Sequence, residues 1–134
     1  MLEQGYGSIL NQSSISALSG FPGSAAYAAS KGAVISLSRQ AAIEYAKQGI
    51  RINVICPGAI DTPLLTTRYT ERMNIEQESV SLAKEALSKV AKKYPMKSIG
   101  STDDVAQMAV FLASDESRWI TGTVFPVDGG FTAV

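Results

Sequence analysis

The sequence predicts an α/β fold built on a parallel sheet, with about three strands and four helices in its 134 residues. Two observations lead to this prediction. Short runs rich in β-branched residues alternate with helical patterns, and short connections join a strand, a helix and a second strand. Such a βαβ unit places its strands parallel with a right-handed crossover. Because three strands make a thin parallel sheet, the predicted architecture is incomplete.

The first predicted strand spans residues Ser8–Ser14. Gly5 and Gly7 break the chain before it, and the run itself is short, partly apolar and ends in small polar residues. A loop is predicted over Leu18–Gly23, because three of its residues are Gly or Pro, which interrupt regular structure.

The longest predicted element is a helix from Ala25 to about Gln48, with Gly49 placed where a helix-ending residue belongs. Its apolar residues recur at spacings of three and four, which is typical of a helix. Those residues are Val34, Leu37, Ala41 and Tyr45. The second strand, Ile50–Cys56, is rich in β-branched residues and stops at Pro57 and Gly58.

The rest of the chain predicts more helix and one more strand. Residues Thr66–Lys93 form a broken helical pattern with a weak apolar stripe, as in a mobile cover over a site. Ser101–Asp104 begins a further helix, with apolar residues on one face. The last strand is Thr123–Val127, where Pro126 suits an edge position. A turn follows at Asp128–Gly130.

Composition excludes several classes of function. Lys and Arg total 12 and so do Asp and Glu, so the charge balance favours neither nucleic acid nor an anionic membrane as a partner. No run of residues is long enough for a membrane span. Cys56 is the one cysteine and there is no histidine, which excludes a disulfide, a zinc site and histidine-dependent nucleophilic catalysis. We expect a soluble, cytoplasmic chain in which Cys56 is a buried free thiol.

Tyr27 and Lys31 are the first candidates for chemistry. They lie four residues apart near the start of the long helix, so their side chains share one face. A free phenol has a pKa of about 10 and is a poor acid or base at neutral pH. A nearby ammonium group and a helix N-terminus both favour the phenolate, which makes proton transfer to or from a substrate hydroxyl feasible. Alone the pair is weak evidence, because this spacing occurs more often in surface pairs.

The strand ends strengthen the hypothesis. Ser14 ends the first predicted strand, and Pro57 and Gly58 follow the second, with Thr62 shortly after. In an open α/β sheet, ligands bind beyond the carboxyl ends of the parallel strands. We therefore expect Ser14, Tyr27 and the loop from Pro57 to Thr62 to meet in one cleft.

Five motifs resemble the short-chain dehydrogenase/reductase family in order and in spacing, over essentially the whole chain. They are Asn11–Ser14, Tyr27–Lys31, Ile50–Val54, Pro57–Thr62 and Asp128–Gly130. The resemblance implies that the sheet is the C-terminal portion of a Rossmann-like, doubly wound parallel sheet.

The resemblance implies three catalytic residues. Tyr27 would be the general acid in ketone reduction and the general base in alcohol oxidation. Lys31 would keep Tyr27 reactive and hydrogen-bond the nicotinamide ribose, and Ser14 would orient and polarise the substrate carbonyl. These roles agree with what the residue types can do chemically.

The resemblance also implies a nicotinamide cofactor, either NAD or NADP, and no metal. Pro57 and Gly58 would wall the nicotinamide pocket, Ile60 would contact the carboxamide through its backbone, and Thr62 through its side chain and backbone. Tyr27 and Lys31 would also touch the cofactor. The choice between NAD and NADP depends on residues after the first two strands of the family fold, which have no counterpart in this sequence.

The expected domain organisation is a single partial domain. No glycine-rich turn follows a first strand here, so residues 1–134 would be the catalytic half, without the N-terminal dinucleotide-binding half, and Met1 would fall inside a helix. The function implied is hydride transfer between NAD(P) and a small secondary alcohol or ketone. The alternative is an inactive, truncated remnant that acts only, if at all, through subunit association. The resemblance implies a homo-oligomer for the full-length form, assembled through the helix that carries Tyr27.

Simpler interpretations are kept for several residues. Ser13 fits a small residue at a strand end, and Thr62 before Pro63 fits a residue that satisfies a turn. Tyr45 and Trp119 are predicted to be packed aromatics.

Overall fold

Strand β2 (Ile50–Pro57) is the centre of a three-stranded parallel sheet with the order β1-β2-β3. The protein was analysed as a computed structural model, which describes residues 1–72 and 80–134. Strand β1 (Gly7–Gln12) pairs along most of β2, and β3 (Val124–Val127) pairs with its second half. The parallel sheet and the edge position of β3 confirm the predicted fold class.

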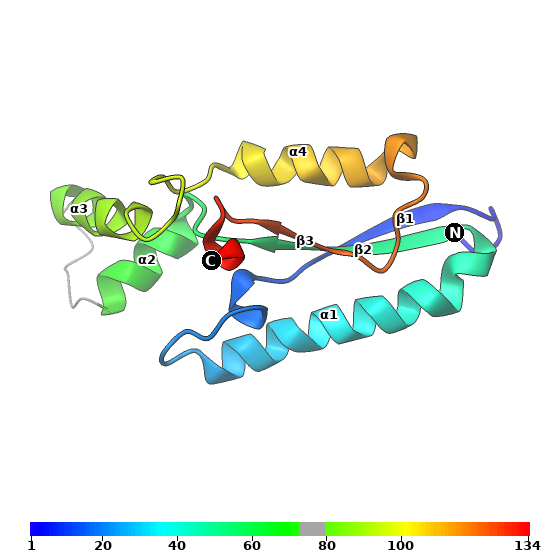
Figure 1. The fold of residues 1–134 in the computed structure, drawn as a ribbon, viewed down its shortest axis with the longest axis horizontal. Coiled ribbons are helices and arrows are strands. Elements are labelled where there is room, and N and C mark those ends of the chain that lie inside the picture. Colours follow the sequence, from blue (N-terminus) through cyan, green and yellow to red (C-terminus); the bar gives the residue numbers. More distant parts are fainter. Residues whose placement is uncertain (73–79) are drawn as a thin grey trace.

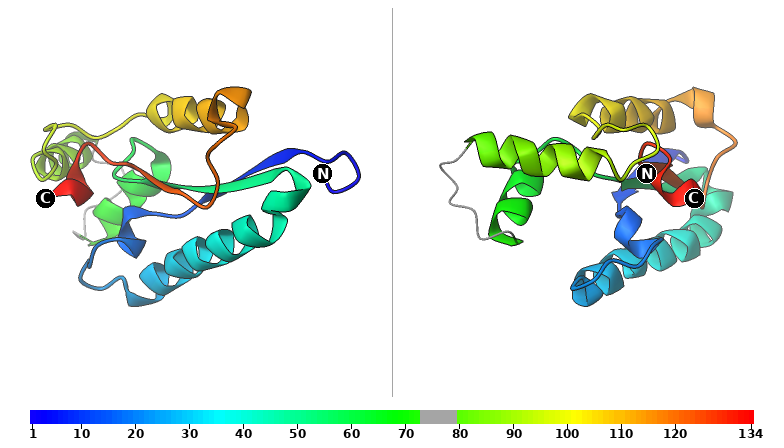
Figure 2. Two further views of the ribbon diagram at one scale, coloured as in Figure 1. Left: turned by 45° about the vertical axis from the view of Figure 1, so that its right-hand side comes forward. Right: turned by 60° about the vertical axis from the view of Figure 1, so that its left-hand side comes forward.

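Helices cover both faces of the sheet (Figure 1). Helix α1 (Ala25–Tyr45) lies on one face and α4 (Thr102–Ala113) on the other, as the turned views of Figure 2 also show. Helices α2 (Pro63–Arg72) and α3 (Val80–Ala91) lie together beyond the carboxyl end of β2. The broken helix that the sequence predicts is therefore this pair, whose connection, residues 73–79, lies outside the described residues.

Alternation along β2 explains why both of its faces are buried. Ile50, Ile52, Val54 and Cys56 pack in clusters with residues of α1. The residues between them point to the opposite face, because side chains alternate along a strand. There the Arg51 guanidinium donates to the Ser114 carbonyl oxygen at 3.0 Å, just after α4. The polar residue Arg51 thus joins the sheet to the C-terminal end of α4.

The packed face of α1 differs from the predicted one. Ile35, Ser38 and Ala42 are buried, whereas Leu37 is 67% exposed and Tyr45 is partly exposed. Apolar residues occur around most of this helix, so spacings of three and four fit more than one side. The spacing therefore identifies the helix without identifying its buried face.

The ends of α1 and β1 are set by local chemistry. Gly49 follows a final 3₁₀ turn with a φ of 74°, so it is the helix-ending glycine that the sequence predicts. A side chain at Gly49 would also collide with the Gly5 carbonyl oxygen. Strand β1 ends at Gln12, two residues earlier than predicted, because Ser14 caps a 3₁₀ turn instead of extending the strand.

Helix α4 begins with a capping box. The Asp104 amide donates to the Ser101 hydroxyl at 3.3 Å, and the Ser101 amide donates to the Asp104 carboxylate at 2.7 Å. The second bond, together with the one from the Ser101 hydroxyl, holds the pKa of Asp104 below its ordinary value of 3.8. Because the folded-state pKa is lowered, this stabilisation is present at neutral pH and is lost as the pH falls through that pKa.

We expect Ser101→Ala to lower the free energy of unfolding by about 1 kcal/mol, because it removes the side-chain cap of α4. Urea unfolding followed by circular dichroism measures the change. Ser36→Ala, at an exposed position inside α1, is the matched control and should cost nothing. Equal loss in both variants would contradict the capping role.

Trp119 corrects one prediction. Its side chain is 96% exposed, so it is not a packed aromatic. It stands after the 3₁₀ turn Asp115–Ser117, in the connection to β3, where no element covers it among the described residues.

Among the described residues, no helix has both the length and the apolar character needed to cross a membrane.

Candidate active site

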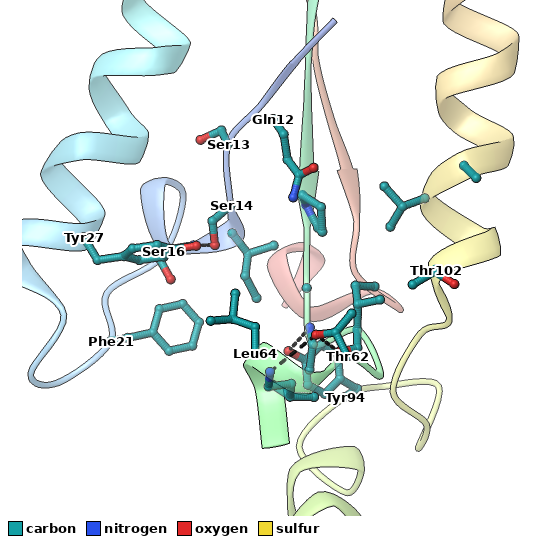
Figure 3. Close-up of a pocket in the computed structure, with 18 of the residues that line it drawn as sticks. Gln12, Ser13, Ser14, Ser16, Phe21, Tyr27, Thr62, Leu64, Tyr94 and Thr102 are labelled. Carbon is teal, nitrogen blue, oxygen red and sulfur yellow. Dashed lines mark hydrogen bonds between the residues drawn. The ribbon is translucent and has the colours of Figure 1, made fainter. Parts of the chain in front are cut away.

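A cavity of about 560 Å³ opens at the carboxyl ends of β1 and β2 (Figure 3). Its walls come from the ends of both strands, from the start of α1, and from α2 and α4. Six of the seven predicted site residues line it: Ser14, Tyr27, Pro57, Gly58, Ile60 and Thr62. The sequence argument that strand ends meet at one edge of the sheet is therefore confirmed in its geometry.

Ser14 lies at the turn where the chain leaves β1. Its hydroxyl oxygen accepts a hydrogen bond from the Ser16 amide at 3.1 Å, which holds the side chain at the cavity wall. Its neighbour Ser13 is buried and donates to the Lys31 carbonyl oxygen at 2.8 Å, so it fastens β1 to α1. Ser13 thus has the structural role predicted for it, although it lines the cavity together with Ser14 and Ser16.

Tyr27 projects from the first turn of α1 into the cavity, toward Ser14 and Ser16 (Figure 3). Its side chain is 38% exposed, so a ligand in the cavity can reach the hydroxyl. The helix begins at Ala25, and its first-turn N–H groups and dipole favour negative charge near Tyr27. Tyr27 therefore lines the cavity from the N-terminal turn of α1.

Lys31 is not among the residues that line the cavity, but its ammonium contacts two that are, Tyr27 and Gln12. Its ammonium is 5.8 Å from the centroid of the Tyr27 ring, within reach of a cation–π contact. The same ammonium donates to the Gln12 carbonyl oxygen at 3.2 Å, at the end of β1. The lysine is thereby held between the tyrosine and the strand end, on the shared helix face that the spacing predicts.

The loop from Pro57 to Thr62 is fixed by backbone contacts on both sides. The Gly58 amide donates to the Val127 carbonyl oxygen of β3 at 3.0 Å. Gly100 donates to the Ala59 carbonyl oxygen at 2.9 Å and accepts from the Asp61 amide at 2.8 Å. These contacts make a parallel bridge between Ile60 and Gly100.

The bridge decides which way the Ile60 peptide groups point. In a parallel bridge, one residue hydrogen-bonds to the two residues that flank its partner. The partner's own N–H and C=O then point away from that residue. Here the partner is Ile60, which lines the cavity. The loop thus turns a backbone donor and an acceptor away from Gly100.

Thr62 fills the turn position that its place before Pro63 indicates. Its hydroxyl donates to the Ile60 carbonyl oxygen at 3.2 Å and accepts from the Leu65 amide at 3.4 Å. Pro63 is the first residue of α2, where a missing N–H costs nothing. Thr62 therefore caps α2 and also lines the cavity.

Sequence reasoning missed part of the cavity wall. Tyr94, between α3 and α4, is buried at the cavity, and its hydroxyl accepts from the Ala59 amide at 2.8 Å. Phe21 and Leu64 add apolar surface, and the start of α4 contributes residues that include Val105. The apolar stripe of α4 was visible in the sequence, but no pattern pointed to Tyr94 or Phe21.

Cys56 is a buried free thiol, as predicted. Burial raises the pKa of the Cys56 thiol, so the sulfur stays protonated at neutral pH. A protonated thiol packed between β2 and α1 is a poor nucleophile. The chemistry of the site therefore rests on its hydroxyl groups, its lysine and its backbone groups.

Known proteins share this sequence over nearly its full length. A family model described as enoyl-(acyl carrier protein) reductase matches residues 1–132. Inactive 2-(S)-hydroxypropyl-CoM dehydrogenase 2 of Xanthobacter autotrophicus is 44% identical over 135 residues, which are 100% of this chain and 55% of that protein. 2-(S)-hydroxypropyl-CoM dehydrogenase 3 of the same bacterium is 37% identical over 134 residues, 100% of this chain and 49% of that protein.

Solved structures share the fold as well. Ligand-free aldohexose dehydrogenase of Thermoplasma acidophilum has a TM-score of 0.93 and 35% identity, covering 100% of this chain and 51% of that one. ElxO with NADP bound has a TM-score of 0.82 and 36% identity, covering 100% of this chain and 50% of that one. The chain thus spans about half the length of the curated relatives it matches. On the sequence match, the parallel sheet and these structures together, it belongs to the short-chain dehydrogenase/reductase family of oxidoreductases.

Proposed function

We propose that this chain is the catalytic half of an oxidoreductase that transfers a hydride between NAD or NADP and a small secondary alcohol or ketone. The observation that carries the proposal is one cavity at the strand ends, lined by Ser14, Tyr27 and the loop from Pro57 to Thr62. Family membership and the dehydrogenase names of its relatives support the reaction class.

The residues at the cavity fit the nicotinamide end of the cofactor. A carboxamide needs both a donor and an acceptor, and the Ile60 backbone turns one of each away from Gly100. Gly58 fits this wall without a side chain, because a Cβ there would lie only 3.0 Å from Asp128 and 3.1 Å from Tyr94. We propose that Pro57, Gly58, Ile60 and Thr62 hold the nicotinamide, which supplies or accepts the hydride when bound.

The protein's own residues would move the proton and polarise the carbonyl. In ketone reduction, Tyr27 gives its hydroxyl proton to the substrate oxygen, and in alcohol oxidation the phenolate takes that proton back. Ser14 donates a hydrogen bond to the same oxygen as negative charge develops on it. Lys31 stabilises the phenolate and presents its ammonium to the nicotinamide ribose.

The rest of the cofactor would lie outside this chain. Among the described residues the outer edge of β1 has no pairing strand, and the curated relatives are about twice as long. We propose that residues 1–134 are a single partial domain, and that a dinucleotide-binding half must be added at the β1 edge for activity. An unpaired parallel edge of this kind is also open to association.

A second candidate function is an inactive subunit. One relative, 44% identical to this chain, carries the word inactive in its name. The outer side of α1 exposes Leu37 and Ile43, which are 67% and 77% exposed and would suit contact with another subunit. On this candidate the chain would associate with other subunits of the family without binding a cofactor.

The two candidates differ in how the purified chain binds halves of the cofactor. We expect reduced nicotinamide mononucleotide to bind, and to shift the amide resonances of Ile60 and Thr62, whereas adenosine monophosphate does not bind. We also expect NADH and NADPH to bind equally, because the residues that read the adenosine ribose are not in this chain. Fluorescence and NMR titration measure all four ligands. Absence of nicotinamide binding by the folded chain would favour the inactive subunit.

Three further properties complete the proposal. The substrate is a small alcohol or carbonyl compound, since apolar side chains such as Phe21 and Leu64 share the cavity with the polar groups. The full-length form is a homo-oligomer. The location is the cytoplasm, where a free cysteine such as Cys56 stays reduced.

A further inference from the structure

The cavity has an apolar end on the side where Tyr27 enters. Phe21, from the loop before α1, and Leu64, from the first turn of α2, both line it. In Figure 3 the Phe21 ring and the Leu64 side chain point toward each other. Leu64 is 75% exposed, so a bound apolar group would cover a leucine that now faces solvent. These two side chains therefore offer a site for the apolar part of a ligand.

The Phe21 ring is held from outside the cavity by Phe131 of the C-terminal turn. The two rings stack with centroids 5.4 Å apart and planes inclined by 18°. Phe131 is partly buried and is not among the residues that line the cavity. It covers one face of the Phe21 ring, so the cavity meets the remaining surface of that ring.

Phe131 is itself fixed by Tyr94 and by its own turn. Its ring centroid lies 5.0 Å from that of Tyr94, which also lines the cavity. The Asp128 carboxylate accepts from the Gly130 amide at 3.0 Å and from the Thr132 amide at 2.9 Å, on either side of Phe131 in the chain. The apolar wall is therefore a packed aromatic cluster, which yields less than a single side chain on a loop.

The polar groups of the cavity decide where a substrate's substituent lies. Under the proposed function, the hydroxyls of Ser14 and Tyr27 bind the substrate oxygen. A substituent on the reacting carbon can then extend from Tyr27 toward Phe21 and Leu64. A flat aromatic group can stack on the Phe21 ring, whereas a puckered ring of the same size cannot make that contact.

We infer that Phe21 is a specificity-determining residue, held in place by Phe131, and that it selects a ketone or secondary alcohol with a flat aromatic substituent on the reacting carbon. This inference rests on the proposed function for the position of the substrate oxygen. The aromatic stack stands on the described contacts alone.

The test compares acetophenone with cyclohexyl methyl ketone, whose ring is puckered, as ligands of the 134-residue chain. NMR titration measures both dissociation constants, with oxidised nicotinamide mononucleotide present because it cannot reduce either ketone. We expect acetophenone to bind about 3- to 10-fold more tightly, as one aromatic stacking contact allows. Apolar burial alone does not favour acetophenone, because the saturated ring is at least as apolar. Equal affinities, or tighter binding of the saturated ketone, would overturn the inference.

Two variants separate the role of Phe21 from that of Phe131. Phe21→Leu should abolish the preference for acetophenone, since an apolar side chain remains but no ring is left to stack on. Phe131→Leu should reduce the preference to less than about twofold, although residue 131 does not line the cavity. Phe111→Leu, in α4 and outside the cavity wall, is the matched control and should keep the full preference. A general loss of stability lowers both affinities alike, so the ratio of the two reports on the wall itself.

A preference that survives Phe21→Leu would overturn the role of Phe21, and one that is unchanged in Phe131→Leu would overturn the support from Phe131. If either variant does not fold, nuclear Overhauser effects in the unmodified chain give the answer. The acetophenone ring protons should lie close to those of Phe21, which should in turn lie close to those of Phe131. Acetophenone contacts that leave out Phe21 would contradict the inference.

Failure of the proposed function has a different signature. If acetophenone is preferred but the unmodified chain does not bind nicotinamide mononucleotide, the aromatic site stands and the proposed reaction is wrong. If the nucleotide binds and the two ketones bind equally, the proposed function stands and the role of Phe21 is wrong.

Discussion

Tyr27→Phe is expected to lower turnover of the proposed reaction by about 10²- to 10⁴-fold, the range typical of a lost general acid or base. The substitution removes the only proton that the side chain can transfer and keeps the ring on the cavity wall. Affinity for reduced nicotinamide mononucleotide should stay close to that of the unmodified chain, because the ring, Lys31 and the Ile60 loop remain.

Turnover can be measured once the missing half is supplied. A chimera would place the N-terminal half of 2-(S)-hydroxypropyl-CoM dehydrogenase 3 before this chain, and formation of NADH or NADPH from a secondary alcohol would report the rate. Tyr45→Phe is a close control, since Tyr45 lies on the same helix and is 38% exposed, like Tyr27. Unchanged turnover in Tyr27→Phe would refute the role of Tyr27 as acid and base.

The fold was predictable where local chemistry decides it. Gly49 ends its helix because only a left-handed residue without a side chain fits there, and Ser101 begins α4 because its hydroxyl caps the first turn. The β-branched residues of Ile50–Cys56 were enough to predict β2. Ser14 lies outside the strand predicted to contain it, because it caps a 3₁₀ turn, and such a turn competes with strand pairing. Residue spacing does not show which of these two structures forms.

The site residues could be predicted only where they belong to one of the five motifs. Ser14, Tyr27 and Thr62 meet because parallel strands present their carboxyl ends at one edge, and chain order is enough to infer that. The hydrogen bond between Tyr94 and Ala59 joins residues that lie 35 positions apart, and no periodic pattern or motif in the sequence indicates a contact at that separation. A tertiary hydrogen bond of this kind depends on where the chain lies after α2 and α3. The weak apolar stripe of Thr66–Lys93 does not specify that position.

Lys31→Ala is expected to weaken both turnover and nicotinamide affinity, each by about 10- to 100-fold, because it removes a charged hydrogen-bond donor. In the present structure that ammonium lies 5.8 Å from the Tyr27 ring centroid and is held by the Gln12 carbonyl oxygen. The backbone of Lys31 still accepts from the Ser13 hydroxyl in the variant, so α1 stays fastened to β1. Lys47→Ala, in the exposed turn after α1, controls for the lost charge.

The double variant of Tyr27→Phe and Lys31→Ala separates the two roles of the lysine. If Lys31 promotes turnover through the tyrosine, then once the phenol is gone its removal costs little more in turnover. Nicotinamide affinity should still fall by the full effect of Lys31→Ala, because the contact with the ribose does not pass through Tyr27. Turnover losses that simply multiply in the chimera would mean that Lys31 acts independently of the tyrosine, and that the cation–π geometry reflects packing on a shared helix face rather than activation of the phenol.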